Sequence, residues 1–247
     1  MARPDRIPDE PVPDGWQLLD LHNHTHRSYD AMLRIEHYEA AHAAGRFHVL
    51  GITEHNRLDG ALELAAAASF PVVCGIELDT ADGELIGLFV REEIPPLLGA
   101  LETAERIRAQ GGLVYLQHPF YPLVRRPLAA PVRDALADAG LVDVVEGRNG
   151  GPFTARPDAR ARAWARARGL PLAASSDAHE PPDVGTCAVA VPPGPLEPAA
   201  LLARLREGIL VDRHRPSLGI LATKARHRFG GGVVRRIRRE PARRRLP

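Results

Sequence analysis

Two histidines one residue apart, His22 and His24, are the first residues in the sequence that could do chemistry. They follow an apolar run that predicts a strand over residues 16–22. Side chains two residues apart on a strand point to the same face, about 6–7 Å from each other. Two such imidazoles can bind one cation. The pair alone is equally consistent with two histidines that end a strand for structural reasons.

Metal-binding side chain types recur at the ends of the other predicted strands. Active sites of parallel barrels are built at the carboxyl ends of several strands, so a common position there favours one shared site. Each residue alone could instead cap a helix, turn the chain or pair with an arginine. The candidate metal ligands are His22, His24, Asp30, His55, Glu77, His118, Asp177 and His179.

The chemistry of this set follows from its five imidazoles and three carboxylates, without a thiolate. Such ligands suit Zn²⁺, Mn²⁺ or Fe²⁺, and eight of them exceed the needs of one ion. We therefore expect two or three divalent ions that share a bridging carboxylate. Ion clusters of this kind hold the oxygens of an in-line displacement and activate water, which favours hydrolysis of a phosphate ester. The residues predicted to be catalytic are His22, His24, Asp177 and His179.

Short apolar strands alternate with helices of ten to fifteen residues, which predicts a parallel sheet with helices outside. Six or seven such units within 247 residues favour a closed α/β barrel in one domain over residues 16–221. The predicted strands are 16–22, 48–56, 71–78, 113–119, 141–147 and 170–177, with a hairpin arm at 84–90 and an apolar stretch at 186–191. The predicted helices are 35–44, 57–68, 96–110, 131–139, 157–168 and 196–208.

The composition, with 45% apolar and 26% charged residues, is that of a soluble globular protein. We expect no membrane span and no signal peptide, and Cys74 and Cys187 make no disulfide framework, so a cytoplasmic location is predicted. Residues 1–15 are rich in proline and predict a flexible lead-in. Residues 222–247 contain ten Lys/Arg and one acid, which leaves 22 basic and 30 acidic residues in the rest of the chain. This tail, predicted to be disordered or partly helical, could make sequence-independent contacts with nucleic acid.

Four further residues are candidates for binding a phosphorylated substrate. Arg125 and Arg126 lie in the loop after His118, and Arg148 and Asn149 directly follow the strand predicted at 141–147. A guanidinium can bind a phosphate through two hydrogen bonds. The alternative for each arginine is a solvated surface charge.

Six segments together resemble the PHP superfamily (polymerase and histidinol phosphatase domains): DLHNHTHRSYD, GITEHN, GIE, QHP, VVEGRNG and SSDAH, in this order. The resemblance covers about residues 17–210 and implies a metal-dependent phosphoesterase on a distorted seven-stranded (β/α) barrel. It also implies a distribution of ligands over three metals. His22, His24, Glu77 and Asp177 resemble the ligands of the first, Asp30, His55 and His179 those of the second, and Glu77 with His118 those of the third.

The chain departs from the family pattern at two places. Glu54 stands where the second motif commonly has aspartate, and the segment 141–147 has no histidine where trinuclear members carry one. We therefore expect two tightly bound ions and a weaker third. The expected substrate is a small phosphomonoester, a nucleotide or an oligonucleotide end. The alternatives are a histidinol-phosphatase-like enzyme and a non-catalytic module whose basic tail binds nucleic acid.

Overall fold

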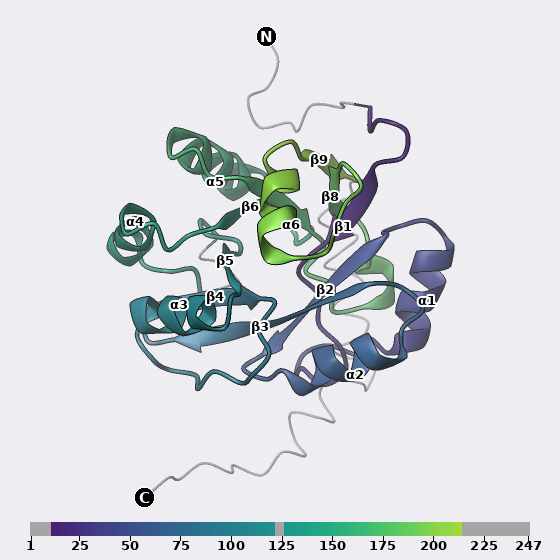
Figure 1. Cartoon of the computed structure of the whole chain (residues 1–247), viewed down its shortest axis with the longest axis horizontal. Helices are drawn as coiled ribbons and strands as arrows, with labels where there is room; N and C mark the ends of the chain where they lie inside the picture. The colour runs from purple at the N-terminus through teal and green to yellow at the C-terminus, as the bar shows by residue number, and fades with distance from the viewer. Residues whose placement is uncertain (1–10, 122–125, 214–247) are drawn as a thin grey trace, which may run out of the picture.

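A computed structural model describes residues 11–121 and 126–213 of the chain. Its strands form one mixed sheet with the order β7-β6-β5-β4-β3-β2-β1-β8-β9 (Figure 1). Their bounds are β1 (Gln17–Asp20), β2 (Val49–His55), β3 (Val72–Thr80), β4 (Gly83–Leu88), β5 (Leu113–Leu116), β6 (Val144–Asn149), β7 (Leu172–Ser175), β8 (Cys187–Val191) and β9 (Ile209–Asp212).

The sheet curves into a nearly closed barrel, which confirms the predicted fold class. Residues that follow β1 and β7 meet at the point of closure, where Asn23 and Ala178 form a parallel bridge. Two backbone hydrogen bonds extend this contact, from Asp177 N to the His22 carbonyl (2.9 Å) and from His24 N to the Ala178 carbonyl (3.1 Å). Closure thus brings together three predicted ligands that lie far apart in the sequence: His22, His24 and Asp177.

Most strands of the sheet run parallel to one another, as predicted, and β4 and β8 run antiparallel to their neighbours; the antiparallel direction of β8 was not predicted. β3 and β4 form the predicted hairpin, with Thr80 paired to Gly83. β9 was not predicted and pairs antiparallel with β8. Strands β1, β2, β3, β5, β6 and β7 point the same way, so their carboxyl ends share one face of the barrel.

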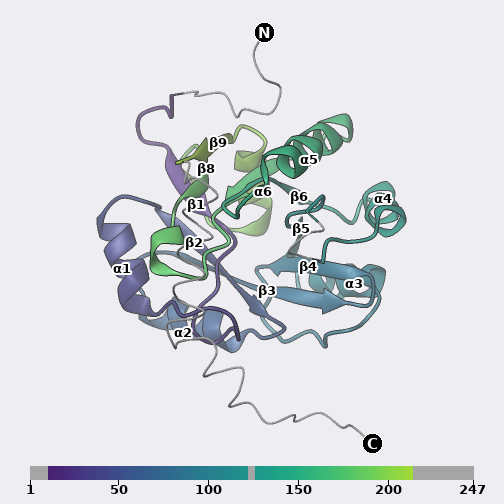
Figure 2. The same ribbon diagram turned by 180° about the vertical axis from the view of Figure 1, so that it is seen from behind.

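Most of the described helices lie around the outside of the barrel, as Figures 1 and 2 show. They are α1 (Ile35–Ala43), α2 (Asp59–Ala67), α3 (Ala100–Ala109), α4 (Ala130–Asp138), α5 (Ala155–Ala167) and α6 (Pro198–Leu205), and a short 3₁₀ turn, η1, spans Pro181–Asp183. The six helices in the described residues overlap the ranges predicted from the sequence. None of the described helices combines the length and the apolar character needed to cross a bilayer.

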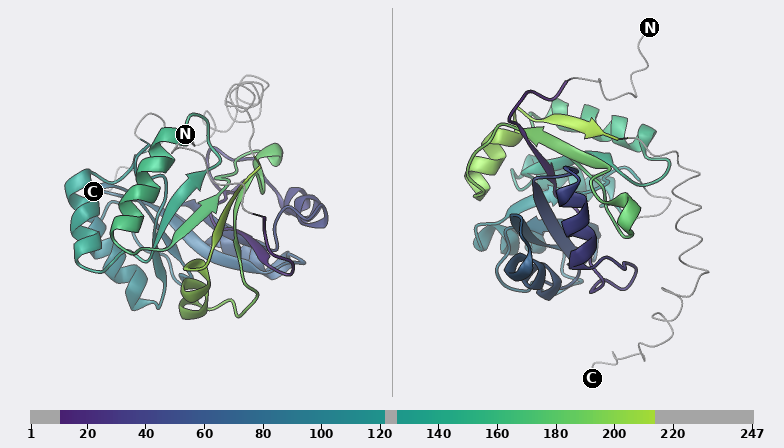
Figure 3. Two further views of the ribbon diagram at one scale, coloured as in Figure 1. Left: turned by 90° about the horizontal axis from the view of Figure 1, so that it is seen from above. Right: turned by 90° about the vertical axis from the view of Figure 1, so that its right-hand side faces the viewer.

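The core has two main apolar layers, one on each side of the sheet. Alternate residues of β2 divide between them: Leu50 and Ile52 pack among residues of α1–α5, whereas Val49 packs in the layer that α6 covers. Figure 3 shows α6 beside β8 and β9. Gly51 lies where β2 passes close to the end of β1, since a Cβ there would stand 2.5 Å from the Leu21 carbonyl oxygen. Burial on both sides keeps the strand ends, and the side chains they carry, in fixed positions.

Candidate metal centre

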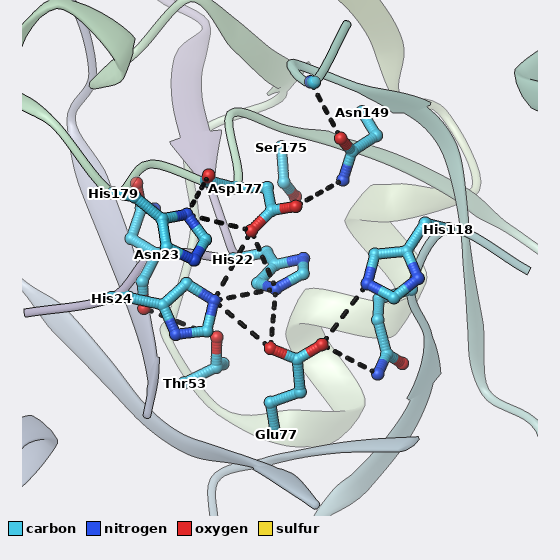
Figure 4. A network of polar contacts seen from close by, with 12 residues as sticks. His22, Asn23, His24, Thr53, Glu77, His118, Asn149, Ser175, Asp177 and His179 are labelled. Carbon is cyan, nitrogen blue, oxygen red and sulfur yellow. Dashed lines mark hydrogen bonds and ion pairs between the residues drawn. The ribbon is translucent and has the colours of Figure 1, made fainter. Parts of the chain in front are cut away.

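The carboxylate of Glu77 lies at the centre of the cluster and faces four imidazoles through its two oxygens. Figure 4 shows three of them, His22, His24 and His118. Its Oε2 lies 3.3 Å from His22 Nε2, 3.2 Å from His24 Nε2 and 3.4 Å from His55 Nδ1. Its Oε1 lies 3.3 Å from His118 Nε2. One buried carboxylate from β3 therefore joins side chains positioned by β1, β2 and β5.

Two aspartates complete the Oε2 side of the cluster. Asp177 Oδ1 lies 3.4–3.5 Å from one nitrogen each of His22, His24 and His179. Asp30 reaches the same region from the loop after β1, with Oδ2 3.2 Å from His179 Nε2 and Oδ1 3.5 Å from His55 Nε2. All eight predicted ligands thus converge on one site at the closing point of the barrel.

The donor atoms fit divalent cations. Two ligand atoms held about 2.0–2.1 Å from a tetrahedral ion stand about 3.3–3.4 Å apart, close to the 3.2–3.5 Å separations around Glu77 and Asp177. Asp30 Oδ1, His55 Nε2 and His179 Nε2 are buried without a hydrogen-bond partner among the described residues. Four groups of three residues each bring their ligand atoms within 4.8 Å of one another inside the group. They are His24, His55, His179; His22, His118, Asp177; His22, His24, Glu77; and Glu77, Glu84, His118.

Polar partners behind the imidazoles orient the nitrogens that face the cluster. His22 Nδ1 lies 3.2 Å from Glu146 Oε1, and His24 Nδ1 lies 3.3 Å from Ser28 Oγ, which itself donates to Glu54. Because a proton on Nδ1 satisfies these contacts, Nε2 keeps its lone pair for a metal. Glu54 also accepts hydrogen bonds from the Thr25 backbone and hydroxyl, so this departure from the common aspartate anchors the loop that follows β1.

Glu146 is fully buried and links three candidate ligands. Besides its contact with His22, its Oε2 accepts hydrogen bonds from His118 N (2.7 Å) and Asn149 Nδ2 (2.9 Å). Asn149 Nδ2 also donates to Asp177 Oδ2 (3.3 Å). Asn149, predicted to bind substrate, therefore lies at the site but contacts the ligand carboxylates. The imidazole that trinuclear members of the resembled family carry in this segment is absent, as the sequence indicated, and a hydrogen-bonded carboxylate and amide stand here instead.

The structure does not support substrate binding by Arg148. Its guanidinium donates to Asp158 (3.1 Å), to both oxygens of Asp212 (2.8 and 3.2 Å), and to Thr154. A β-bulge between Glu146 and Arg148 breaks the alternation of side chains, so these two residues do not share a face. Arg148 thus joins β6 to α5 and β9.

The two arginines after His118 have different outcomes. Arg126 is described: its exposed guanidinium lies 3.4 Å from Asp79, which is next to the cluster on β3. Arg125 lies outside the described residues. Substrate binding by Arg126 stays a prediction.

Sequence reasoning missed Glu84 on β4, whose Oε2 lies 3.9 Å from His118 Nε2. The signal was the hairpin register, since Glu84 pairs with Asp79 two residues beyond Glu77. It also missed Asp20, a fully buried carboxylate that accepts hydrogen bonds from Ser176 and Gly185. Asp20 supports the closing point from below without contacting the cluster.

The charges of the cluster are strongly coupled. Burial alone would raise the pKa of Glu77, but the imidazoles of His22 and His55 hold it well below its usual range. Burial lowers the pKa of His24, yet hydrogen bonds with Asp177 and Glu77 raise it to about 9. Protons on the imidazoles thus balance the carboxylates, and divalent cations would balance them in the same place.

Two candidate ligands have backbone conformations that most residues avoid. His118 has φ +29° and Asp177 has φ +49°, both in the left-handed region. Such conformations cost about 1–3 kcal/mol each and cluster at functional sites. The fold therefore holds these two ligands in place against a local backbone preference.

Comparisons with known proteins agree with this geometry. The model of the PHP domain matches residues 20–126, and the model of a PHP-associated segment matches residues 156–209. The chain is a PHP domain protein, which confirms the resemblance found in its motifs. The two matches include the strand ends that carry all eight predicted ligands.

Two curated proteins have sequences similar to parts of this chain. Two uncharacterized proteins of Methanocaldococcus jannaschii are 42% identical over 31% of this chain and 37% identical over 53% of it. The matches cover 47% and 52% of those proteins, so the chain spans about half the length of the curated relatives it matches.

Among solved structures, a similar fold occurs in a two-domain protein from Bacteroides vulgatus that contains a predicted PHP-like metal-dependent phosphoesterase. The TM-score is 0.65 at 18% identity, over 89% of this chain and 73% of that one. PsfC from Pseudomonas syringae has the same TM-score and identity, over 87% of this chain and 99% of its own. These two likenesses concern the fold.

Proposed function

We propose that this protein is a metal-dependent phosphoesterase that hydrolyses a phosphate ester. The observation that carries the proposal is the arrangement around Glu77, whose two oxygens face imidazoles on opposite sides. A carboxylate in this position can be shared by two ions, and paired ions suit in-line displacement at phosphorus.

The candidate ligands would form two metal sites. His22, His24, Glu77 and Asp177 would hold one ion, and Asp30, His55 and His179 a second. Bound divalent ions would supply Lewis-acid chemistry, activating water and stabilising charge on the phosphoryl oxygens. Glu146 and Ser28 would keep the imidazoles in the tautomer that binds metal.

The proposed substrate class is a small phosphomonoester, a nucleotide or an oligonucleotide end. Arg126, exposed beside Asp79, would bind its phosphate. A histidinol-phosphatase-like activity is the alternative within the same chemistry. The non-catalytic alternative is disfavoured by the convergence of all eight ligands. Nucleic-acid contact by residues 222–247, which lie outside the described residues, stays a proposal, as does a cytoplasmic location.

The test is phosphate release from nucleotides, sugar phosphates and histidinol phosphate with Mn²⁺ or Zn²⁺ added to purified protein. We expect turnover that a chelator abolishes and the metal restores, and that His22→Ala removes. Absence of both bound metal and turnover, with His22→Ala unchanged from wild type, would overturn the proposal.

A further inference from the structure

Three stacked rings run from the centre of the cluster to the surface. The rings of His24 and His55 have centroids 4.4 Å apart and planes 21° apart. The ring of Tyr29 in turn stacks on that of His55, with centroids 5.0 Å apart and planes 29° apart. His24 is fully buried, whereas Tyr29 is 57% exposed. The stack therefore begins at a candidate metal ligand and ends in an aromatic ring open to solvent.

Exposed aromatic rings are otherwise rare in the described residues. The large apolar side chains exposed there include two aromatic ones, Tyr29 and Phe153, each 57% exposed. Tyr29 adjoins Asp30, and Phe153 follows β6 in the loop that Asn149 holds through a 2.8 Å hydrogen bond from Gly151 N. Both rings thus lie in loops anchored at the metal cluster. An exposed aromatic ring beside a candidate active site is a candidate for contact with a ligand.

The position of Tyr29 selects the kind of group it could hold. His55 covers one face of the Tyr29 ring, so the exposed area leaves another face for a planar ring that continues the stack. Nucleobases stack on aromatic side chains in this way. In a phosphomonoester the only organic group is the leaving group of hydrolysis. If the phosphate lies at the cluster, a substrate ring stacked on Tyr29 therefore belongs to the leaving group.

We propose that Tyr29 is a stacking platform for the leaving group, and that the preferred substrate class is a nucleoside monophosphate. The inference rests on the proposed function and narrows its substrate class. In the reaction, the water oxygen bonds to phosphorus and the P–O bond to the nucleoside breaks. One proton of the water ends on the nucleoside oxygen and the other on inorganic phosphate.

The test compares two esters that differ only by the base, adenosine 5′-monophosphate and ribose 5-phosphate. With the Mn²⁺-loaded protein, kcat/KM should favour the nucleotide by about tenfold or more. Tyr29→Ala should reduce this ratio about tenfold, whereas Tyr29→Phe should keep it, because the phenyl ring retains the stacking face. Leu62→Ala, an exposed apolar residue on α2, is the matched control and should leave the ratio unchanged. Metal content of each variant is measured in parallel.

Two results would overturn the inference while leaving the phosphoesterase function intact: equal kcat/KM for the two esters, or a ratio that Tyr29→Ala does not change. Preference for phosphocholine, whose cation could lie over the ring instead, would also overturn it. Calorimetric binding of adenosine against ribose separates the two proposals, since it needs no turnover. If another ester such as histidinol phosphate is hydrolysed and these two are not, the inference about Tyr29 fails and the phosphoesterase function stands. If no ester is hydrolysed, the phosphoesterase proposal fails. Stacking then stands only if adenosine binds and Tyr29→Ala abolishes that binding.

Discussion

The two oxygens of Glu77 face very different surroundings. Around Oε2 gather three imidazoles and, beyond them, the carboxylates of Asp177 and Asp30. Around Oε1 lie His118 Nε2 and the amide of Gln117, which donates from 3.2 Å, with Glu84 farther away. The first side offers complete ligand sets for two ions, and the second offers one imidazole.

This difference shows how one carboxylate can serve sites of unequal strength. His22 and His24, on the crowded side, each have a partner that fixes the ring through Nδ1. His118 has no hydrogen-bond partner at Nδ1 among the described residues. Fewer and less firmly oriented ligands imply lower metal affinity. We therefore expect tight binding at the Oε2 side and weaker binding at the Oε1 side.

The largest expected effect contrasts His22→Ala with His118→Ala. His22 contacts both shared carboxylates, so its loss should lower kcat/KM by about 10³-fold and remove tightly bound metal. His118→Ala should cost about 10–100-fold and spare the tight metal. Steady-state kinetics and elemental analysis measure both, with His37→Ala on α1 as a histidine control outside the cluster. Equal losses in the two variants would contradict the inequality of the two sides.

Glu146 connects the two sides of the cluster, because it contacts both His22 and the backbone of His118. Glu146→Gln would turn an amide group toward groups that already donate, and metal affinity should fall about 10–100-fold. Competition with a chromophoric chelator measures this affinity. Tyr115→Phe removes one donor to Glu146 and should change the affinity much less. Unchanged metal binding in Glu146→Gln would show that Glu146 does not position the ligands.

Asp20 is a buried carboxylate that holds Gly185 and Ser176, the residue before Asp177, on the Oε2 side of the cluster. Burial raises the pKa of Asp20 to about 6, although Ser176, Asn23 and Gly185 donate hydrogen bonds to it. The folded protein therefore keeps a proton there up to a higher pH than the unfolded chain. The proton on Asp20 therefore adds to the free energy of unfolding at low pH. This stabilisation is lost as pH rises between about 3.8 and 6.

Asp20→Asn removes that titration, so its cost relative to wild type should be larger at pH 4 than at pH 7. The difference should be up to about 3 kcal/mol. Urea unfolding of both chelator-treated proteins at the two pH values measures it, and the other titrating groups cancel in the comparison. A cost that does not change with pH would mean that the pKa of Asp20 is not raised.

The smallest effect is expected for Arg126→Ala at the margin of the Oε1 side. An exposed ion pair with Asp79 contributes little to stability, so the fold should be unaffected. If Arg126 binds the phosphate, KM should rise about threefold to tenfold with kcat nearly unchanged. Arg106→Ala, an exposed arginine paired with Glu102 on α3, is the matched control. A KM equal to that of the control would end the substrate-binding role predicted for Arg126.

Much of the fold could be predicted because strands and helices alternate with distinct periods along the chain. The direction of β8 could not, because CAVAV is buried on both faces and resembles a parallel strand in composition. β9 is short and only partly buried throughout, so ILVD after α6 carried too weak a pattern to be recognised. Antiparallel pairing depends on contacts between distant segments, which local sequence does not specify.

The candidate site could be predicted where ligands lie at or near the ends of regular strands: His55 ends β2, Glu77 lies near the end of β3, and His118 follows β5. Arg148 could not, because the bulge that turns it away from Glu146 is a property of strand pairing. Nor could the contact between Glu146 and His22, which lie 124 residues apart. The sequence indicated the metal-binding residue types, and only the closed barrel revealed their polar partners.

Metal titration of wild type and Glu77→Gln is the most direct test of a cluster organised around a shared carboxylate. Calorimetry with Mn²⁺ or Zn²⁺ counts the equivalents bound by chelator-treated protein. We expect at least two tight equivalents in wild type. In Glu77→Gln we expect loss of the equivalent held by His22, His24 and Asp177, together with the weaker binding at His118. No tight binding in wild type, or binding that Glu77→Gln leaves unchanged, would contradict the shared role of Glu77.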